Sequence, residues 1–150
     1  MARWVTKANK GTANVQSIAI VVAAAASPRR AKIYDYTIGS GATPGDNAFV
    51  HIVQRCTTAG TGTALTPTAL DSADTLASTI VVKDTTTVDP TLTANAFLGR
   101  KALNQRATFR WVAAPYGEII IPATASNGVI LGLGTASTTD MDAECHYEEL

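Results

Sequence analysis

The chain has 150 residues and a mass of 15.6 kDa, which suits one domain that can build a core without metal or disulfide staples. Hydrophobic residues make up 46% and charged residues 16%, a balance that argues against intrinsic disorder because disordered chains are poor in apolar residues. The net charge is zero, so the composition does not indicate bulk attraction to nucleic acid.

Short apolar or alternating runs recur along the chain, separated by clusters rich in glycine, threonine and serine at residues 39–45, 57–63 and 123–128. Such punctuation is typical of strands of about five to eight residues with a turn every ten or so. It predicts an all-β protein: a single-domain, jelly-roll-like antiparallel β-sandwich of about eight to ten strands.

The first element is a basic N-terminal segment, residues 1–12. It carries three cations and an aromatic ring: Arg3, Trp4, Lys7 and Lys10. We interpret it as an arm that leaves a sandwich of residues 13–150 and contacts a partner, with the ring supplying burial and the cations steering. The alternative is that Trp4 packs on its own sandwich.

The second element is the apolar stretch of residues 17–26. Its length is too short to span a bilayer, although it suits the apolar region of a secretory signal. Its Ile and Val residues suit a strand, so we interpret it as a buried or subunit-contacting strand and expect no membrane partner.

Further strands are expected at 31–38, 47–57, 79–83, 88–93, 106–113, 119–121, 129–133 and 140–148. Alternation in 106–113 points Phe109 and Trp111 to the core and Arg106 and Arg110 to the opposite face, where we expect contacts to acidic groups of a neighbouring subunit. In the last strand, alternate residues starting at Met141 face the core.

Three connections have local signals of their own. An Asn127-Gly128 pair between two apolar runs predicts a hairpin. Residues 71–77 suit a single helical turn, because Asp71 or Ser72 can cap it. Residues 94–103 suit either a helix or a strand.

The sequence predicts no catalytic, cofactor or metal site. The best metal candidate is the outward face of the last strand, with Asp142, Glu144, His146 and Glu148, but alternating polar residues are the usual condition of a solvated strand face, which is the interpretation we favour. Cys56 and Cys145 sit inside strands, which favours free, buried thiols in a reducing cytoplasm.

The two ends of the chain carry opposite charge. Residues 1–33 hold six bases and no acid, and after Arg110 there are six acids and no further base. The ends can therefore pair as neighbouring strands within one subunit, or a basic arm can meet the acidic edge of another copy.

Two stretches resemble small virion proteins of tailed bacteriophages, of the kind encoded beside capsid genes. They are Asp46–Thr63, with Pro67 and Leu70-Asp71 after it, and Asn104–Pro115, with Gly117-Glu118 and Ile121–Ala123 after it. The resemblance implies a capsid decoration (cement) protein, often trimeric, and supplies no functional motif.

The sequence and the resemblance together lead us to expect a non-enzymatic virion protein made in the host cytoplasm. It would bind the outer surface of the head as a homo-oligomer, most simply a trimer, with the major capsid protein as its partner. One alternative is a head–tail or tail component. Another, of a different class, is a carbohydrate-binding sandwich or a cupin-like enzyme, which an exposed aromatic platform or a His-rich interior would support.

Overall fold

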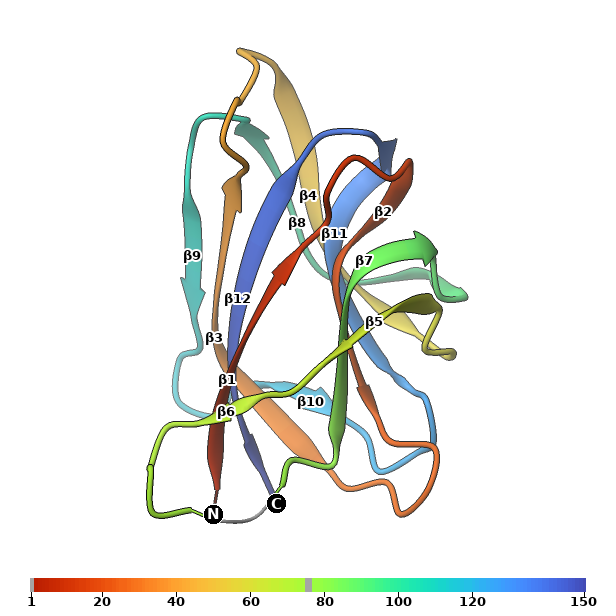
Figure 1. Ribbon diagram of the computed structural model, residues 1–150, viewed down its shortest axis with the longest axis vertical. Coiled ribbons are helices and arrows are strands. Elements are labelled where there is room, and N and C mark those ends of the chain that lie inside the picture. Colours follow the sequence, from red (N-terminus) through yellow and green to blue (C-terminus); the bar gives the residue numbers. More distant parts are fainter. Residues whose placement is uncertain (1, 75–76) are drawn as a thin grey trace.

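The computed structural model describes residues 2–74 and 77–150, in which two six-stranded antiparallel sheets pack face to face (Figure 1). Sheet A contains β1 (Arg3–Asn9), β3 (Ala31–Ser40), β6 (Thr68–Ala69), β9 (Phe109–Val112), β10 (Ile119–Ile121) and β12 (Met141–Glu149). Sheet B contains β2 (Val15–Ala23), β4 (Ala48–Cys56), β5 (Thr61–Leu65), β7 (Ile80–Val88), β8 (Leu92–Asn104) and β11 (Gly128–Ser137). The prediction of an all-β sandwich is confirmed.

The strand order mixes distant parts of the chain. Sheet A runs β10-β3-β12-β1-β6, with β9 also pairing with β3, and sheet B runs β5-β7-β2-β11-β4-β8. With β5, β6 and β7 set aside, most connections cross from one sheet to the other. The remaining strands form the ladder β1-β12-β3, edged by β9 and β10, and the ladder β2-β11-β4-β8.

The main core lies between the sheets and takes side chains from both, including Trp4 and Ile33 from sheet A and Val21 and Leu131 from sheet B. A second cluster contains only sheet B strands, with Ile20, Val22, Ile52, Cys56 and Ile130. Because side chains alternate along β2, this strand serves both clusters and is buried on both faces. The prediction of a buried strand is therefore confirmed for residues 17–23, whereas residues 24–26 follow the end of β2 and are more exposed.

The prediction of a free N-terminal arm is wrong for residues 3–10. Strand β1 lies inside sheet A, paired with β12 on one side and β6 on the other. Trp4 is 3% exposed and Lys10 is fully buried. Trp4, Thr6 and Ala8 share one face of β1 and are all buried, so the segment belongs to the sandwich core.

The pairing of β1 with β12 also settles the two readings of the charged ends. Arg3 is in register with Glu148 and Lys7 with Glu144, so the basic and acidic ends meet within one subunit. The chain termini accordingly lie at the same end of the molecule (Figure 1).

Several local expectations need correction. Residues 94–103 lie in strand β8, and the predicted strand at 88–93 is instead the junction at which β7 ends at Val88 and β8 begins at Leu92. Within the described part of residues 71–77 there is a turn and no helix: Ala73 N–H donates to Asp71 Oδ1 over 2.9 Å. Residues 75 and 76 lie outside the described residues.

The predicted hairpin at Asn127-Gly128 is also wrong. Strand β10 pairs with β3 in sheet A, whereas β11 pairs with β2 and β4 in sheet B. Ser126, not Gly128, takes the positive φ of the connection. A Cβ on Gly128 would lie 2.1 Å from Val21 O, so glycine is required here for close approach to β2.

Candidate functional site

The predicted partner-contact residues do not form one site. Trp4 and Lys10 are buried within the chain, so neither is an exposed anchor. The Lys10 ammonium group donates to three backbone carbonyls, those of Ala13 (2.6 Å), Thr139 (3.1 Å) and Ser137. Its role in the subunit is therefore to tie β1 to the connection between β11 and β12.

The other basic candidates lie on or beside sheet A. Arg3 Nε is 3.8 Å from Glu148 Oε2, and Arg110 donates to both oxygens of Asp35, so these cations already have acidic partners within the chain. Arg106 is exposed in the turn between β8 and β9. The expected contacts of Arg106 and Arg110 with a neighbouring subunit stay predictions.

The polar face of β12 points outward, as alternation predicts. His146 Nε2 lies 2.9 Å from Glu144 Oε1, and the ring packs edge-on against Tyr34. Within residues 2–74 and 77–150, no group of three or more His, Cys, Asp or Glu side chains lies close enough to hold a metal ion. In the same part of the chain, no helix is long and apolar enough to cross a membrane.

The groups with nucleophilic or basic chemistry are buried. Both cysteines are free and buried, as predicted. Burial raises the pKa of Cys56 to about 12 and raises that of Cys145, so both thiols stay protonated near neutral pH. His51 is 1% exposed, and burial lowers its pKa to about 4.

His51 is held between the sheets. Its Nδ1 lies 3.0 Å from Gly132 O and its Nε2 3.5 Å from the Tyr36 hydroxyl, with the Phe109 ring beside it. A neutral imidazole suits this position because one ring nitrogen donates to the carbonyl and the other faces a hydroxyl. The geometry assigns His51 to packing.

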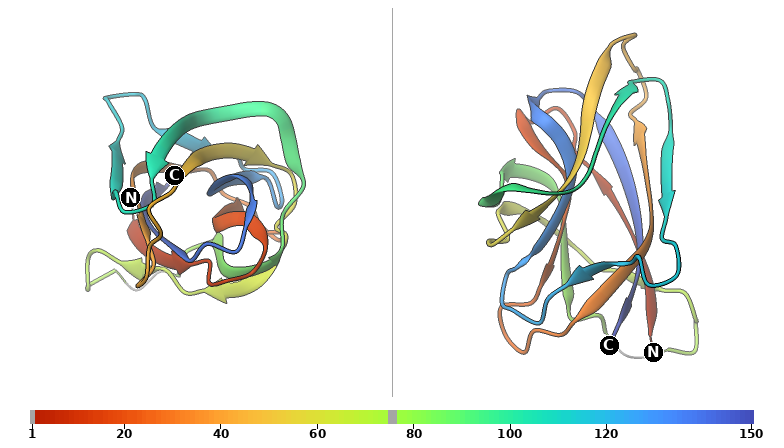
Figure 2. Two further views of the ribbon diagram at one scale, coloured as in Figure 1. Left: turned by 90° about the horizontal axis from the view of Figure 1, so that it is seen from above. Right: turned by 180° about the vertical axis from the view of Figure 1, so that it is seen from behind.

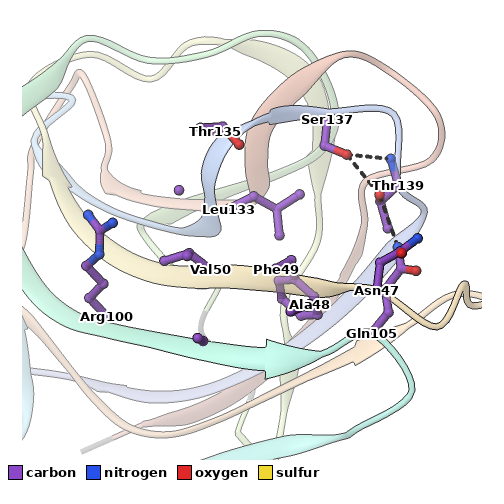
Figure 3. Close-up of a pocket in the computed structure, with 12 residues that line it drawn as sticks. Asn47, Ala48, Phe49, Val50, Arg100, Gln105, Leu133, Thr135, Ser137 and Thr139 are labelled. Atoms are coloured by element: carbon purple, nitrogen blue, oxygen red, sulfur yellow. Dashed lines mark hydrogen bonds between the residues drawn. The ribbon is translucent and has the colours of Figure 1, made fainter.

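A pocket of about 400 Å³ opens where β4, β8 and β11 run together, near the connection between β11 and β12 (Figure 3). Its apolar lining includes Phe49, Val50 and Leu133. Its polar lining includes Asn47, Arg100, Gln105, Thr135, Ser137 and Thr139. Arg100 lies at one end and Gln105, Ser137 and Thr139 lie together at the other (Figure 3).

The polar end of the pocket is a connected network. Gln105 Nε2 donates to Thr139 Oγ1 over 3.1 Å, and Thr139 Oγ1 lies 2.8 Å from Ser137 Oγ. Gln105 is 9% exposed, and its Oε1 is buried without a hydrogen-bond partner. Sequence reasoning missed this site because its residues come from three separate segments and match no motif.

Strand β8 offers a second feature, an open sheet edge. Among the described strands it pairs only with β4, although it is 13 residues long. Seen from above, it follows the outside of β4 (Figure 2). Phe97 and Leu98, at its centre, are 39% and 44% exposed. An open apolar edge is a template for pairing with another chain.

Comparison of the chain with protein-family models, with characterised proteins and with solved structures finds no match.

Proposed function

We propose that this chain is a non-enzymatic virion structural protein of the capsid decoration type. In this proposal it associates with further copies of itself and binds the major capsid protein on the outer surface of a head. Many copies would each add contact area across seams between capsid subunits, so that avidity rather than any single strong contact stabilises the shell.

The observation that carries the proposal is the open edge of β8. Unpaired strand edges expose a row of backbone N–H and C=O groups, and natural proteins usually cover them, shorten them or place charges along them. Here the edge is long, and Phe97 and Leu98 add apolar surface at its centre. Two cations, Arg100 and Lys101, are the only charges along it. A partner that adds a strand would satisfy the edge and cover the apolar pair.

The strand order supports the same class of protein. The ladders β1-β12-β3, edged by β9 and β10, and β2-β11-β4-β8 are compatible with the strand order of a jelly roll when β5, β6 and β7 are treated as an insertion between β4 and β8. We propose that the sandwich is a jelly roll. Jelly rolls occur in viral capsid proteins, and also in lectins and cupins, so the fold alone does not select among them.

The proposal is tested by co-sedimentation with empty heads assembled from tailed-bacteriophage major capsid proteins. We expect saturable binding of the wild-type chain and of Val112→Lys, which replaces a 59% exposed valine on sheet A. We expect weaker binding of Leu98→Lys, because a lysine at the β8 edge disfavours strand addition. Recovery of the wild-type chain in the supernatant at every concentration would contradict the proposal.

A further inference from the structure

We propose that a second pocket, lined by Arg55 and here called the Arg55 pocket, binds a small oxyanion such as a carboxylate or a phosphate. The inference concerns a site separate from the open edge of β8 and does not depend on the proposed function.

The Arg55 pocket lies where β4 of sheet B comes against β10 of sheet A. It takes its lining from the end of β4, the start of β8, β10 and the start of β11, and it has a volume of about 370 Å³. Such a volume falls within the range of small-molecule sites. Of the described residues that line it, Arg55 alone is charged, so the pocket is locally positive.

The first observation is the position of the Arg55 side chain. It is partly buried, whereas the other arginines of the chain are all exposed. Its guanidinium group donates to Ile120 O, a contact that crosses from one sheet to the other and fixes where the cation lies. Arg55 also lines the pocket itself, so a ligand there can reach it.

The second observation is the lack of a charge partner. Arg3, Lys32 and Arg110 each lie beside a carboxylate of the same chain. Within residues 2–74 and 77–150, Arg55 forms no such ion pair, although it is more buried than any other arginine. A guanidinium group has five N–H donors, and the one carbonyl contact leaves most of them free. A cation that is partly withdrawn from water favours an anion beside it.

The third observation is the presence of further free donors. The Thr93 hydroxyl and the Asn127 amide line the same pocket, and neither side chain has a hydrogen-bond partner in the described part of the chain. Both groups can donate to an oxygen atom. Hydroxyl and amide groups alone would suit a neutral ligand equally well. The uncompensated charge of Arg55 selects an anion, because charge-assisted hydrogen bonds are about twice as strong as neutral ones.

The test is amide chemical-shift mapping on the full-length chain at constant ionic strength, with acetate, inorganic phosphate and acetamide as probes. We expect at least one of the two anions to shift the resonances of Arg55, Asn127 and Gly128 in a saturable way, with a Kd of about 10 mM or tighter. Acetamide, the uncharged analogue of acetate, is expected to leave them unchanged. The stronger of the two anions identifies the ligand as a carboxylate or a phosphate.

Two variants locate the binding. Arg55→Gln removes the charge and is expected to weaken binding about tenfold. Thr93→Glu places a carboxylate in the pocket from an exposed position and is expected to abolish binding, which keeps the proposal testable if the first variant does not fold. Thr135→Glu makes the same charge change at an exposed position of β11 outside the Arg55 pocket, and as the matched control it is expected to bind like the wild type.

Each other outcome overturns the proposal. Resonances that neither anion shifts mean that the pocket takes no oxyanion. Equal shifts with acetate and acetamide mean that the charge of Arg55 does not select the ligand. Binding that survives unchanged in folded Arg55→Gln or Thr93→Glu means that the anion binds elsewhere.

Discussion

Strands β1 and β8 differ in how completely the chain itself supplies their strand neighbours and charge partners. Strand β1 has seven residues and a neighbour on each side, and the acids of β12 stand opposite its bases. Strand β8 has 13 residues and two cations, pairs with only one of the described strands, and has exposed apolar side chains at its centre. The sequence suggests the reverse, because β1 looks like a loose basic arm.

The difference separates the part of the molecule that makes the fold from the part left for a partner. Changes in β1 should act on the stability of the subunit. Changes in β8 should leave the fold intact and act on association. The predictions below test this division.

Deletion of residues 2–10 is expected to have the largest effect, which is loss of folding. The deletion removes a strand from the interior of sheet A, together with the buried Trp4 and Lys10. Circular dichroism and amide dispersion in the NMR spectrum measure this directly. A folded, cooperatively melting product would mean that β1 is an arm after all.

Replacement of Lys10 by Met is expected to destabilise the subunit by about 3 kcal/mol, because it leaves buried carbonyl groups without their donor. Urea unfolding measures the change in free energy. Lys7→Met, at an exposed position of the preceding strand β1, is the matched control and should change little. Equal effects of the two substitutions would show that the buried ammonium group is not a structural tie.

Acidification should weaken the sandwich through His51. Its pKa in the fold is about 4, below the ordinary value of 6.5, so the unfolded chain takes up a proton first. Stability is therefore lost as the pH falls from 6.5 towards 4, by about 3 kcal/mol in total. Urea unfolding across this range should show that His51→Gln lacks this component and that His146→Gln keeps it. Identical pH profiles of wild type and His51→Gln would contradict the assignment.

Replacement of Arg3 by Gln should have the smallest effect, within about 0.5 kcal/mol, because the Arg3 side chain is 65% exposed and its Nε lies as far as 3.8 Å from Glu148 Oε2. The same unfolding measurement checks this. A loss of several kcal/mol would mean that the charge ladder between β1 and β12, and not burial, holds the first strand in place.

The sequence predicts those elements whose apolar period is clear. Alternation in 140–148 places Met141 and Cys145 in the core, and residues 17–23 of the apolar run at 17–26 lie buried in β2. Prediction fails where a residue pattern arises from a distant part of the chain and not from local structure. Gly128 marks a close approach to β2 rather than a hairpin, and the bases of β1 are neutralised only by acids about 140 residues away.

The candidate pocket lies beyond what the sequence can predict. Gln105, Ser137 and Arg100 reach it from three strands or connections, and only the pairing of β4 with both β8 and β11 brings them together. The open edge cannot be predicted from the sequence either, because the pattern of β8 suits a helix or a strand, and nothing local indicates that no described strand pairs with its outer side.

Light scattering of the purified chain over a range of concentrations tests most directly the claim that β8 is an association edge. We expect the wild-type chain and Val112→Lys to show the same mass, a multiple of 15.6 kDa. We expect Leu98→Lys to shift to 15.6 kDa with an unchanged melting temperature. A wild-type mass of 15.6 kDa at all concentrations, or a Leu98→Lys mass equal to that of the wild type, would contradict the claim.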